Sequence, residues 1–484
     1  MKNVKKTNAP TTSVASGIFK SYDIRGTVPN QLNPDVARLI GRAFVAEIKG
    51  EAVAVGRDMR VHSDDLAEGL IAGLMDSGCR VVDLGRVSTD ALYFAVGHLE
   101  MDGGIMITAS HNPPEYNGFK LCRSQAEPLS GADGIDRMKM AIEMDDYNLD
   151  RGDGTRSPAN ILPDFIEHVL SFIDPKRLKP FKVVVDAGNG MAGAVLPAVF
   201  NRLPVKLIPM YFELDGTFPN HLANPIEPEN IADLQKRVLA EKADFGVAFD
   251  GDADRMFLID ENGKPLGGDI VTLLVAKNLL AKNPGATILY NLICSKAVPE
   301  MIERQGGRAV RTPVGHALIK PLMKRDGAIF GGEHSGHFYF QKNWYADSGL
   351  IAMLMAMEVL AEADQPLSAL VASVDPYFRS GEINTKVKNI SMTLEKIVEA
   401  FPDALPDRTD GITTSYDDWW FNVRPSNTEP LLRLNVEAHS ADLLEEKTAE
   451  LLAVIRGRRK TVSKPKRPAT GGAARRRGRG KSSE

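Results

Sequence analysis

Apolar runs that end in polar, glycine-containing loops recur along the chain. The runs at 52–60, 182–190 and 245–255 are rich in β-branched and other apolar residues, and their loops read GRDMR, DAGNG and DGDADR. Continuous apolar runs of this length, followed by helical patterns, are typical of strands in sheets that are covered on both faces. The pattern predicts the α/β class, with functional loops at the carboxyl ends of strands.

A loop with unusual chemistry lies within residues 104–121, GIMITASHNPPEYNGFKL. Its first apolar residues predict a short buried strand, which ends in a loop that two prolines stiffen and that places Ser110 beside His111. We expect the backbone to turn at Asn117-Gly118 and to bring in Lys120. A hydroxyl held still at the end of a strand is a candidate nucleophile, whereas the alternative is an ordinary turn whose serine caps a helix.

Length and composition indicate a multidomain globular protein. A chain of 484 residues, 43% of them apolar and 25% charged, is expected to form about three or four domains. The net charge of −4 argues against nucleic-acid binding by the body of the protein. The three cysteines have no CxxC spacing, so we expect reduced, packed thiols and neither a zinc site nor a disulfide framework.

The sequence shows no targeting or membrane segment. No apolar segment of a secretory signal follows the lysines of the first twenty residues. The longest apolar stretch, which starts at Gly349, contains Glu358 and is too short to cross a membrane. We expect this stretch to form a buried helix, and the protein to be cytoplasmic and free of membrane contact.

Polar and glycine-rich stretches mark candidate boundaries. Linkers are predicted at 148–160 and 373–384, and a hairpin turn near a boundary at 260–268. The last segment, 459–484, is strongly basic and has no aromatic residue. Because such a segment cannot bury a core, we expect a disordered basic tail.

The sequence DGDADR places three alternating carboxylates, Asp250, Asp252 and Asp254, directly after an apolar strand. Carboxylates packed this closely repel one another unless a cation lies among them, and hard oxygen ligands favour Mg²⁺ or Ca²⁺. An EF-hand is rejected, because its sixth position is Arg255 instead of glycine and a strand precedes the loop. The remaining alternative is a solvated acidic turn.

Two further motifs carry polar side chains suited to recognition. In GGEHSGH, Glu333, Ser335 and His337 alternate, so they can project together and bind hydroxyl groups. In RPSNTEPLLRL, the side chains of four residues, together with backbone amides, can form a nest for phosphate: Arg424, Ser426, Asn427 and Thr428. Ordinary loop residues and a helix cap are the respective alternatives.

Together these motifs supply the parts of a phosphoryl-transfer site. FKSYDIRG at 19–26, TASHNPPEYNGFK at 108–120, DGDADR, GEHSGH and RPSNTEP resemble, in order and approximate spacing, the motifs of the α-D-phosphohexomutases. The E-x-S-G-H loop most resembles the bacterial phosphomannomutase/phosphoglucomutase branch. The resemblance covers nearly the whole chain except the tail, which is not a feature of the family.

The resemblance implies four domains around a central cleft. Three would share an α/β fold with a mixed sheet, and the fourth would be an α+β domain similar to the TATA-box-binding protein. We expect these domains and the tail at 1–155 (serine loop), 156–262 (metal loop), 263–375 (sugar loop), 376–458 (phosphate loop) and 459–484.

The resemblance also implies a mechanism. Ser110 would carry a phosphoryl group, give it to a hexose 1-phosphate and recover the other phosphate of the resulting 1,6-bisphosphate, which also acts as activator. Mg²⁺ would be bound by Ser110, as phosphoserine, and by Asp250, Asp252 and Asp254. Arg25, Lys120 and Arg255 would lie near the reacting phosphate, and His111 would hold the serine loop. Lys296 and His316 would lie near the sugar, with a possible acid/base role, and the sugar hydroxyls would be bound by Glu333, Ser335 and His337. The distal phosphate would be bound by Arg424, Ser426, Asn427 and Thr428.

Other functions remain open at this point. The sugar loop favours mannose and glucose phosphates over a phosphoglucosamine or phosphopentose mutase, and the retained Ser110 and Arg255 argue against a phosphosugar-binding protein without turnover. Asp90 stands where the family commonly has proline, which we expect to alter a turn and not the chemistry. No G-x-S-x-G surrounds Ser110, which disfavours a serine hydrolase. We expect a monomer whose basic tail is the part able to contact nucleic acid.

Overall fold

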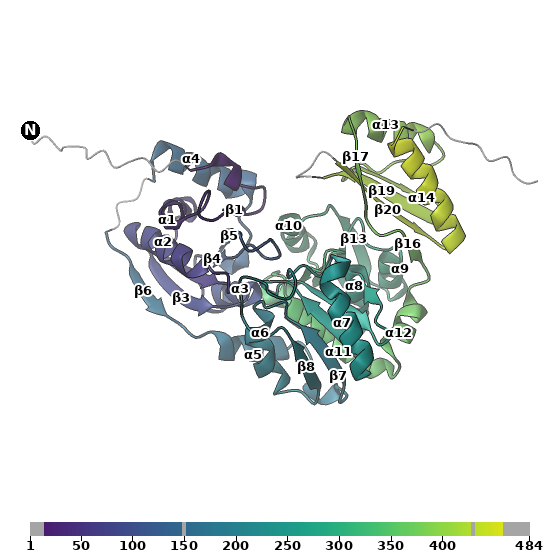
Figure 1. Ribbon diagram of the computed structural model, residues 1–484, viewed down its shortest axis with the longest axis horizontal. Coiled ribbons are helices and arrows are strands. Elements are labelled where there is room, and N and C mark those ends of the chain that lie inside the picture. The colour runs from purple at the N-terminus through teal and green to yellow at the C-terminus, as the bar shows by residue number, and fades with distance from the viewer. Residues whose placement is uncertain (1–13, 148–151, 427–430, 458–484) are drawn as a thin grey trace, which may run out of the picture. The chain divides into compact units, whose positions relative to one another are not determined.

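The computed structural model describes residues 14–147, 152–426 and 431–457, apart from the side chains of 316 and 317. The chain divides into two compact units between Tyr377 and Phe378. The predicted tail, together with Asn427 and Thr428 of the phosphate loop, lies outside the described residues. Figure 1 labels many of the helices and strands of both units.

The first unit contains three mixed sheets. The first has the order β1-β5-β4-β2-β3-β6, the second β11-β10-β9-β7-β8 and the third β13-β12-β14-β15. Their strands are β1 (Ile24–Thr27), β2 (Ala52–Arg57), β3 (Arg80–Arg86), β4 (Gly103–Ile107), β5 (Tyr116–Arg123), β6 (Thr155–Pro158), β7 (Lys182–Asp186), β8 (Lys206–Met210), β9 (Phe245–Phe249), β10 (Met256–Asp260), β11 (Pro265–Leu266), β12 (Thr287–Asn291), β13 (Arg308–Thr312), β14 (Phe330–Gly332) and β15 (Phe338–Phe340).

One topology is repeated in the three sheets. In each, the first strand of the repeat lies between the second and the third, all three are parallel, and the fourth is antiparallel to the third: β3-β2-β4-β5, β8-β7-β9-β10 and β13-β12-β14-β15. Two of the apolar runs, at 52–60 and 182–190, form the equivalent first strands β2 and β7, whereas the run at 245–255 forms β9, the third strand of the second repeat. The predicted α/β class with three similar mixed-sheet domains is confirmed.

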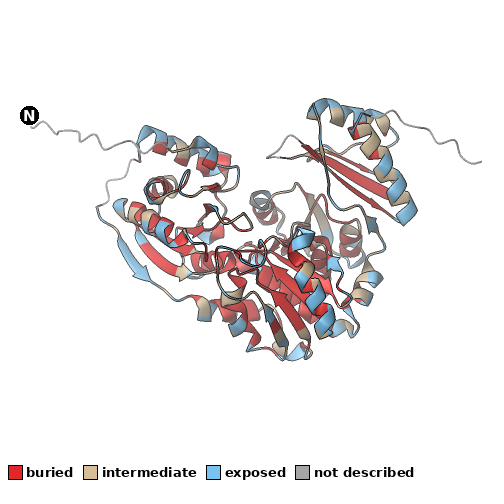
Figure 2. Cartoon of the chain, viewed as in Figure 1, coloured by how far each residue is buried: buried red, intermediate tan, exposed pale blue. Residues whose placement is uncertain are grey.

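Helices cover both faces of these sheets, and the alternation of side chains along each strand decides which core a residue joins. On β2, Val53 and Val55 pack with α1 and α2, whereas Ala52 and Ala54 face the core that contains α3. Figure 2 shows these strands as a buried layer between more exposed helices. The helices of the unit are α1 (Pro34–Ile48), α2 (Ser63–Asp76), α3 (Thr89–His98), α4 (Asp136–Met144), α5 (Leu162–Leu170), α6 (Ala192–Phe200), α7 (Pro228–Glu241), α8 (Gly268–Lys282), α9 (Ala297–Arg304), α10 (His316–Asp326), α11 (Gly349–Ala363) and α12 (Leu367–Val374).

One apolar core joins the three domains. It includes α3 of the first domain, α6 of the second, and α8 with α11 of the third. Helix α11 is buried over nearly its whole length, which confirms the buried helix predicted from Gly349. Ser348 caps its N-terminus by accepting from the Ile351 amide at 3.1 Å. The loops of the three domains are therefore anchored on one common body.

The second unit is a single antiparallel sheet with two helices. Its strands are β16 (Phe378–Arg379), β17 (Ile383–Lys386), β18 (Ile412–Ser415), β19 (Trp419–Pro425) and β20 (Leu431–Ala438), and its helices are α13 (Ile390–Ala400) and α14 (Ala441–Ile455). Along β19, Trp419, Phe421 and Val423 join the core with the helices. Arg424 alternates with them and so lies on the opposite face of the sheet.

Two local expectations are wrong. Asn117 and Gly118 do not turn but belong to β5, where they pair with Gly26 and Arg25 of β1. A side chain at 118 would lie 2.4 Å from the Ile24 carbonyl, so Gly118 serves a close approach between strands. The predicted linker at 148–160 includes β6, which pairs with β3 and completes the first sheet.

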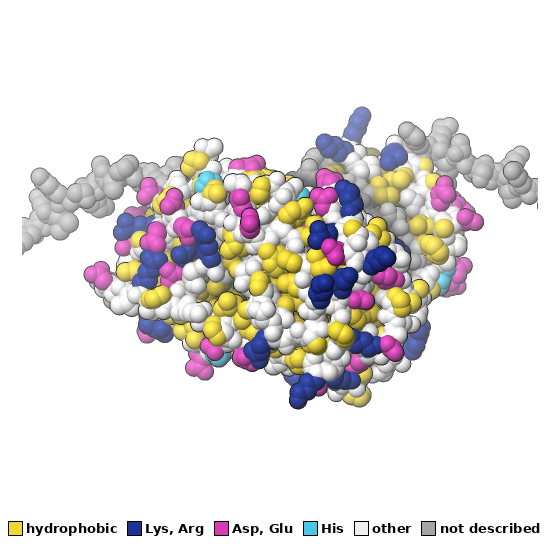
Figure 3. Space-filling view, turned by 60° about the horizontal axis from the view of Figure 1, so that its bottom comes forward, with side chains coloured by type: hydrophobic (Ala, Val, Ile, Leu, Met, Phe, Trp, Pro, Cys, Tyr) yellow, Lys and Arg dark blue, Asp and Glu magenta, His cyan; other side chains and the backbone are white. Residues whose placement is uncertain are grey.

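Other expectations agree with the structure. Residues 260–268 contain the antiparallel turn between β10 and β11, and the three cysteines are buried and form no disulfide. In the part of the chain that the structure describes, no helix has the length and apolarity that a membrane span requires. Basic and acidic side chains are interspersed on the face shown in Figure 3.

Candidate active site

Three equivalent loops carry the predicted chemistry. In each domain the loop joins the third strand of the repeat to the antiparallel fourth strand. We call them the serine loop (108–115, between β4 and β5), the metal loop (250–255, between β9 and β10) and the sugar loop (333–337, between β14 and β15). The repeated fold therefore places three different motifs at one topological position.

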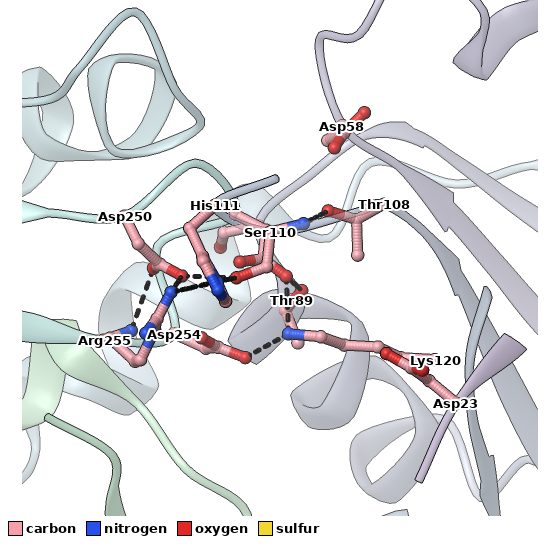
Figure 4. Close-up of polar contacts among 12 residues, drawn as sticks. Asp23, Asp58, Thr89, Thr108, Ser110, His111, Lys120, Asp250, Asp254 and Arg255 are labelled. Carbon is pink, nitrogen blue, oxygen red and sulfur yellow. Dashed lines mark hydrogen bonds and ion pairs between the residues drawn. The ribbon is translucent and has the colours of Figure 1, made fainter. Parts of the chain in front are cut away.

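Ser110 is held in an uncommon conformation in the serine loop. Its φ is 52°, in the left-handed region, and the residue is only 4% exposed. Its amide donates to Thr108 Oγ1 at 2.9 Å, and its hydroxyl donates to Asp250 Oδ2 at 2.7 Å (Figure 4). Ser110 does not cap a helix; its hydroxyl faces the metal loop, as a nucleophile beside a metal site would.

The three aspartates of the metal loop converge. Asp250, Asp252 and Asp254 are buried, and one carboxylate oxygen from each lies within 4.8 Å of the others. Among the described side chains, Asp252 Oδ1 and Asp254 Oδ1 are buried oxygens that accept no hydrogen bond. Buried, unsatisfied carboxylate oxygens are costly, and a hard divalent cation would satisfy them. The residues therefore fit a magnesium site.

The three carboxylates of this cluster outnumber Lys120 and Arg255, the two basic side chains that pair with them. Lys120 Nζ donates to Asp252 Oδ2 at 2.6 Å and also to Asp254. Burial alone would raise the pKa of Asp252, but the Lys120 ammonium outweighs it and lowers that pKa. Burial and then the Asp252 carboxylate raise the pKa of Asp254 to about 7. Lys120 thus contacts both carboxylates but does not offset the burial of Asp254, which can hold a proton or a metal.

Arg255 ties the metal loop to the serine loop. Its Nε donates to Asp250 Oδ2 at 2.9 Å and its Nη2 donates to Ser110 Oγ at 3.3 Å. Nη2 also donates to His111 Nδ1 at 2.5 Å. Burial and then Arg255 lower the pKa of His111 well below its usual range, so the imidazole is neutral. Its Nδ1 is occupied as an acceptor, which supports a positioning role for His111.

Arg25 lies on β1, beside the serine loop. Its Nη1 donates to Asn112 Oδ1 at 2.6 Å and its Nη2 donates to Asp23 Oδ2 at 2.5 Å. Because β1 pairs with β5, which carries Lys120, the N-terminal motif and the serine loop share one edge of the sheet. The structure therefore brings together Ser110, His111, Arg25, Lys120, Arg255 and the three aspartates.

In the sugar loop, the three residues that the sequence analysis placed in one group have different partners. Glu333 is buried and accepts from Tyr339 Oη at 2.9 Å and from Ser335 Oγ at 3.1 Å. His337 instead contacts Asp347 Oδ2 through Nδ1 at 2.9 Å, and the same nitrogen lies 3.9 Å from Asp254 Oδ1. Glu333 and Ser335 form one pair, and His337 faces the metal loop.

The two remaining predicted residues of the third domain lie at helix N-termini. Lys296 directly precedes α9 and is a partly exposed residue whose Nζ lies 4.0 Å from Glu300. His316 is the first residue of α10, and its side chain lies outside the described part of the structure.

The phosphate loop belongs to the second unit. Arg424 Nη2 donates to Glu382 Oε2 at 2.7 Å, and Arg433 contacts the other oxygen of Glu382 at 3.2 Å. Arg433 Nη2 also donates to Ser426 Oγ at 3.3 Å. The sequence prediction missed Arg433, although it lies inside the quoted motif; its alternation with the core residues of β20 was the available signal.

Several other site residues were missed because their partners are distant in sequence. Thr89 Oγ1 donates to Asp252 Oδ2 at 2.6 Å, and Lys320, which is fully buried, contacts Asp347 at 2.9 Å. Asp90 accepts from Ser348 Oγ at 2.6 Å, so it links α3 to α11 instead of only altering a turn. No local pattern in the sequence predicts these contacts.

Fold and site together define a phosphotransferase of the mutase class. The chain matches the four Phosphoglucomutase/phosphomannomutase domain families: alpha/beta/alpha domain I at residues 16–146, domain II at 163–263, domain III at 267–377 and the C-terminal domain at 382–454. The chain therefore belongs to the phosphoglucomutase/phosphomannomutase family of hexose phosphate mutases.

Individual relatives agree with this assignment. The chain is 41% identical over 443 residues to a phosphohexose mutase of Xanthomonas campestris pv. campestris, covering 91% of this chain and 99% of the relative. It is 39% identical over 467 residues to the phosphomannomutase/phosphoglucomutase of Pseudomonas aeruginosa, covering 94% and 97%. A family structure from Burkholderia thailandensis superposes with a TM-score of 0.84 at 34% identity, covering 92% and 98%.

Proposed function

We propose that the protein interconverts the 1-phosphates and 6-phosphates of mannose and glucose through phosphorylated Ser110 and a hexose 1,6-bisphosphate. The observation that carries this proposal is the 2.7 Å hydrogen bond from the Ser110 hydroxyl to Asp250, inside a cluster of three carboxylates. The names of the relatives support mannose and glucose as the sugars.

The reaction exchanges phosphoryl groups and consumes nothing else. The bond from phosphorus to Ser110 Oγ breaks as the free hydroxyl of the hexose monophosphate forms a bond to phosphorus and loses its proton. The other phosphoryl group of the bisphosphate then returns to Ser110, and the released sugar oxygen takes up a proton. Added hexose 1,6-bisphosphate can rephosphorylate a chain that has lost its phosphoryl group. We therefore expect the bisphosphate to activate the enzyme.

Mg²⁺ is the cofactor in this proposal. Asp250, Asp252, Asp254 and the Ser110 oxygen would hold it, and it would offset negative charge on the transferring group. The chain itself supplies further positive charge through Lys120 and Arg255, both buried beside the carboxylates. Arg25 and His111 hold the serine loop and its reacting group in place.

The remaining residues are proposed to bind the sugar and its second phosphate. A carboxylate and a hydroxyl, such as the Glu333–Ser335 pair, accept hydrogen bonds from hydroxyls in either substrate orientation. Lys296, His316 and His337 are proposed near the sugar, and His316 as an acid or base. Arg424, Ser426, Asn427 and Thr428 are proposed to bind the phosphate that is not reacting, with a single chain as the active unit.

Ser110→Ala tests the proposal. We expect turnover of mannose 1-phosphate and glucose 1-phosphate, assayed with Mg²⁺ and a trace of bisphosphate, to fall at least about 10³-fold, because positioning alone does not replace the covalent step. Intact-mass measurement should find one phosphoryl group on the wild type and none at this site in the variant.

The matched control is Ser171→Ala, an exposed serine whose hydroxyl contacts only the His168 carbonyl among the described atoms. It should keep wild-type turnover. Full activity of Ser110→Ala, or a wild type that acts on glucosamine or pentose phosphates but not on the two hexoses, would contradict the proposal; binding of phosphosugar without turnover would identify a binding protein.

A further inference from the structure

We propose that Arg60 is the positioning residue of the serine loop: its buried guanidinium fixes the backbone that presents Ser110, although Arg60 itself touches no reacting group. Four backbone carbonyls of this segment converge on it. Nη2 donates to the carbonyls of Ser110 at 2.9 Å and Asn112 at 2.6 Å, and Nη1 donates to those of Pro113 at 2.8 Å and Tyr116 at 3.0 Å. This inference rests on the proposed role of Ser110.

The guanidinium is enclosed and cannot exchange these contacts for water. The Arg60 side chain is 0% exposed, and so is that of its ion-pair partner Asp58, whose Oδ2 lies 3.3 Å from Nε. Phe218, from the second domain, lies over the guanidinium with its ring centroid 5.0 Å away. A side chain at Gly216 would come within 2.4 Å of the Arg60 backbone, so the second domain closes directly over this residue.

Asp58 extends the same support to the end of the loop. Its Oδ1 accepts from the Arg60 amide at 3.0 Å and from Ser63 Oγ at 2.5 Å. Ser63 Oγ in turn accepts from Asn117 Nδ2 at 3.0 Å. The loop and the first residues of β5 are therefore held through four carbonyls and the Asn117 side chain, and all five contacts lead back to one buried ion pair.

The loop needs this support because its central residue is strained. A non-glycine residue with φ of 52° persists only where the surrounding structure over-determines it. The loop also meets the metal loop closely, since a Cβ on Gly251 would lie 2.4 Å from the Ser110 carbonyl oxygen. A guanidinium suits this task because it offers five donors in a fixed plane, whereas an ammonium offers three at a point.

Arg60→Lys in the full chain is the first test. The charge stays but the fork is lost, so we expect kcat for mannose 1-phosphate to fall about 10²-fold, as for a small misplacement of reacting groups, with KM little changed. Amide hydrogen exchange should rise in residues 109–117 and stay at wild-type levels elsewhere. Methylguanidinium should restore part of kcat in Arg60→Ala.

Arg57→Lys is the matched control, because Arg57 ends β2 three residues before Arg60 and pairs with Asp64 and Asp83 but donates to no serine-loop carbonyl among its described contacts. It should keep wild-type kcat. A wild-type kcat in Arg60→Lys would overturn the inference while leaving the phosphoserine mechanism intact, whereas an unphosphorylated, inactive wild type would refute the proposed function itself.

Ser63→Ala covers the case in which the Arg60 variants fail to fold. It keeps the ion pair and removes only the hydroxyl between Asp58 and Asn117, so we expect a several-fold lower kcat, an unchanged KM and faster exchange at 116–118. Wild-type kcat and exchange in Ser63→Ala would then overturn the inference.

Discussion

The serine loop and the metal loop occupy the same position in two copies of one fold, yet they are stabilised in opposite ways. The serine loop is stabilised by contacts to its backbone: Arg60 donates to three of its carbonyls and to that of Tyr116, where β5 begins. The metal loop carries three buried carboxylates whose contacts are mainly between side chains, to Lys120, Thr89 and Arg255. The serine loop is therefore fixed mainly through its backbone, and the metal loop mainly through charged side chains.

The difference follows from what each loop supplies. A nucleophile must be placed to within a fraction of an ångström, so its backbone is fixed by directional hydrogen bonds. A cation site needs an excess of negative charge and ligand atoms that are left unsatisfied until the metal arrives, which Asp252 Oδ1 and Asp254 Oδ1 provide. Loops at equivalent positions of two similar domains can therefore supply different parts of one site, here the nucleophile and the metal ligands.

The substitution Asp252→Asn removes one of the charges that stabilise the metal loop, and we expect it to have the largest effect on Mg²⁺ binding and kcat. Loss of a ligand and of the negative charge that Lys120 balances should weaken Mg²⁺ binding and lower kcat about 10³-fold, because a metal supplies several kcal/mol of charge stabilisation. Calorimetric titration with Mg²⁺ and steady-state kinetics measure both. Hydrogen exchange of the serine loop should stay unchanged.

The control for this variant is Asp233→Asn, since Asp233 is an exposed aspartate that pairs with Lys236. Both its kinetics and its Mg²⁺ affinity should equal those of the wild type. If Asp252→Asn turns over normally in the presence of a chelator, the metal loop is only an acidic turn.

Gly251→Ala should have the next largest effect, because it attacks the contact between the two loops. The added Cβ would lie 2.4 Å from the Ser110 carbonyl oxygen, so one loop must move. We expect kcat to fall about 10²-fold through misplacement of Ser110, with Mg²⁺ affinity nearly unchanged. Gly17→Ala, where nothing lies within 4 Å of the added carbon, should be neutral in both assays.

The smallest effect concerns pH. Because Asp254 has a pKa of about 7 in the folded chain against 3.8 ordinarily, the metal-free folded state binds a proton in this window that the unfolded state has lost. Stability of the metal-free protein should therefore fall as pH rises from about 4 to about 7. Mg²⁺ should bind more tightly as pH rises, by up to about tenfold per pH unit, with release of about one proton.

Urea unfolding in chelator and calorimetry in buffers of different ionisation enthalpy measure these two effects. Asp254→Asn should reduce the fall in stability across this window, and Asp90, whose pKa burial also raises to about 7, should account for part of the fall that remains. Asp252, whose pKa is lowered, contributes stability that is lost only as the pH falls below the ordinary range of a carboxylate, so it does not mask the trend. Metal-free stability that rises across the window would contradict the assignment.

The sequence alone determined the α/β class and the order of the motifs, because these depend on local patterns, whereas the three similar domains were expected from the resemblance to the phosphohexomutases. Apolar runs of five or six residues predicted β2, β4, β7 and β9, and the spacing of Asp250, Asp252 and Asp254 by itself put three carboxylates on one short loop. Local sequence also predicted that Ser110 ends a strand.

Tertiary structure decided which side chains meet and how the loops are held. Asn117 and Gly118 have the composition of a turn, but pairing with β1 makes them part of a strand. His337 contacts Asp347 and lies near Asp254, both from other segments, so only the folded chain separates it from the Glu333–Ser335 pair. Contacts between residues far apart in the chain have no local signal, and Arg60 is the clearest case: only the folded chain places its guanidinium beneath four carbonyls found 50 to 56 residues later.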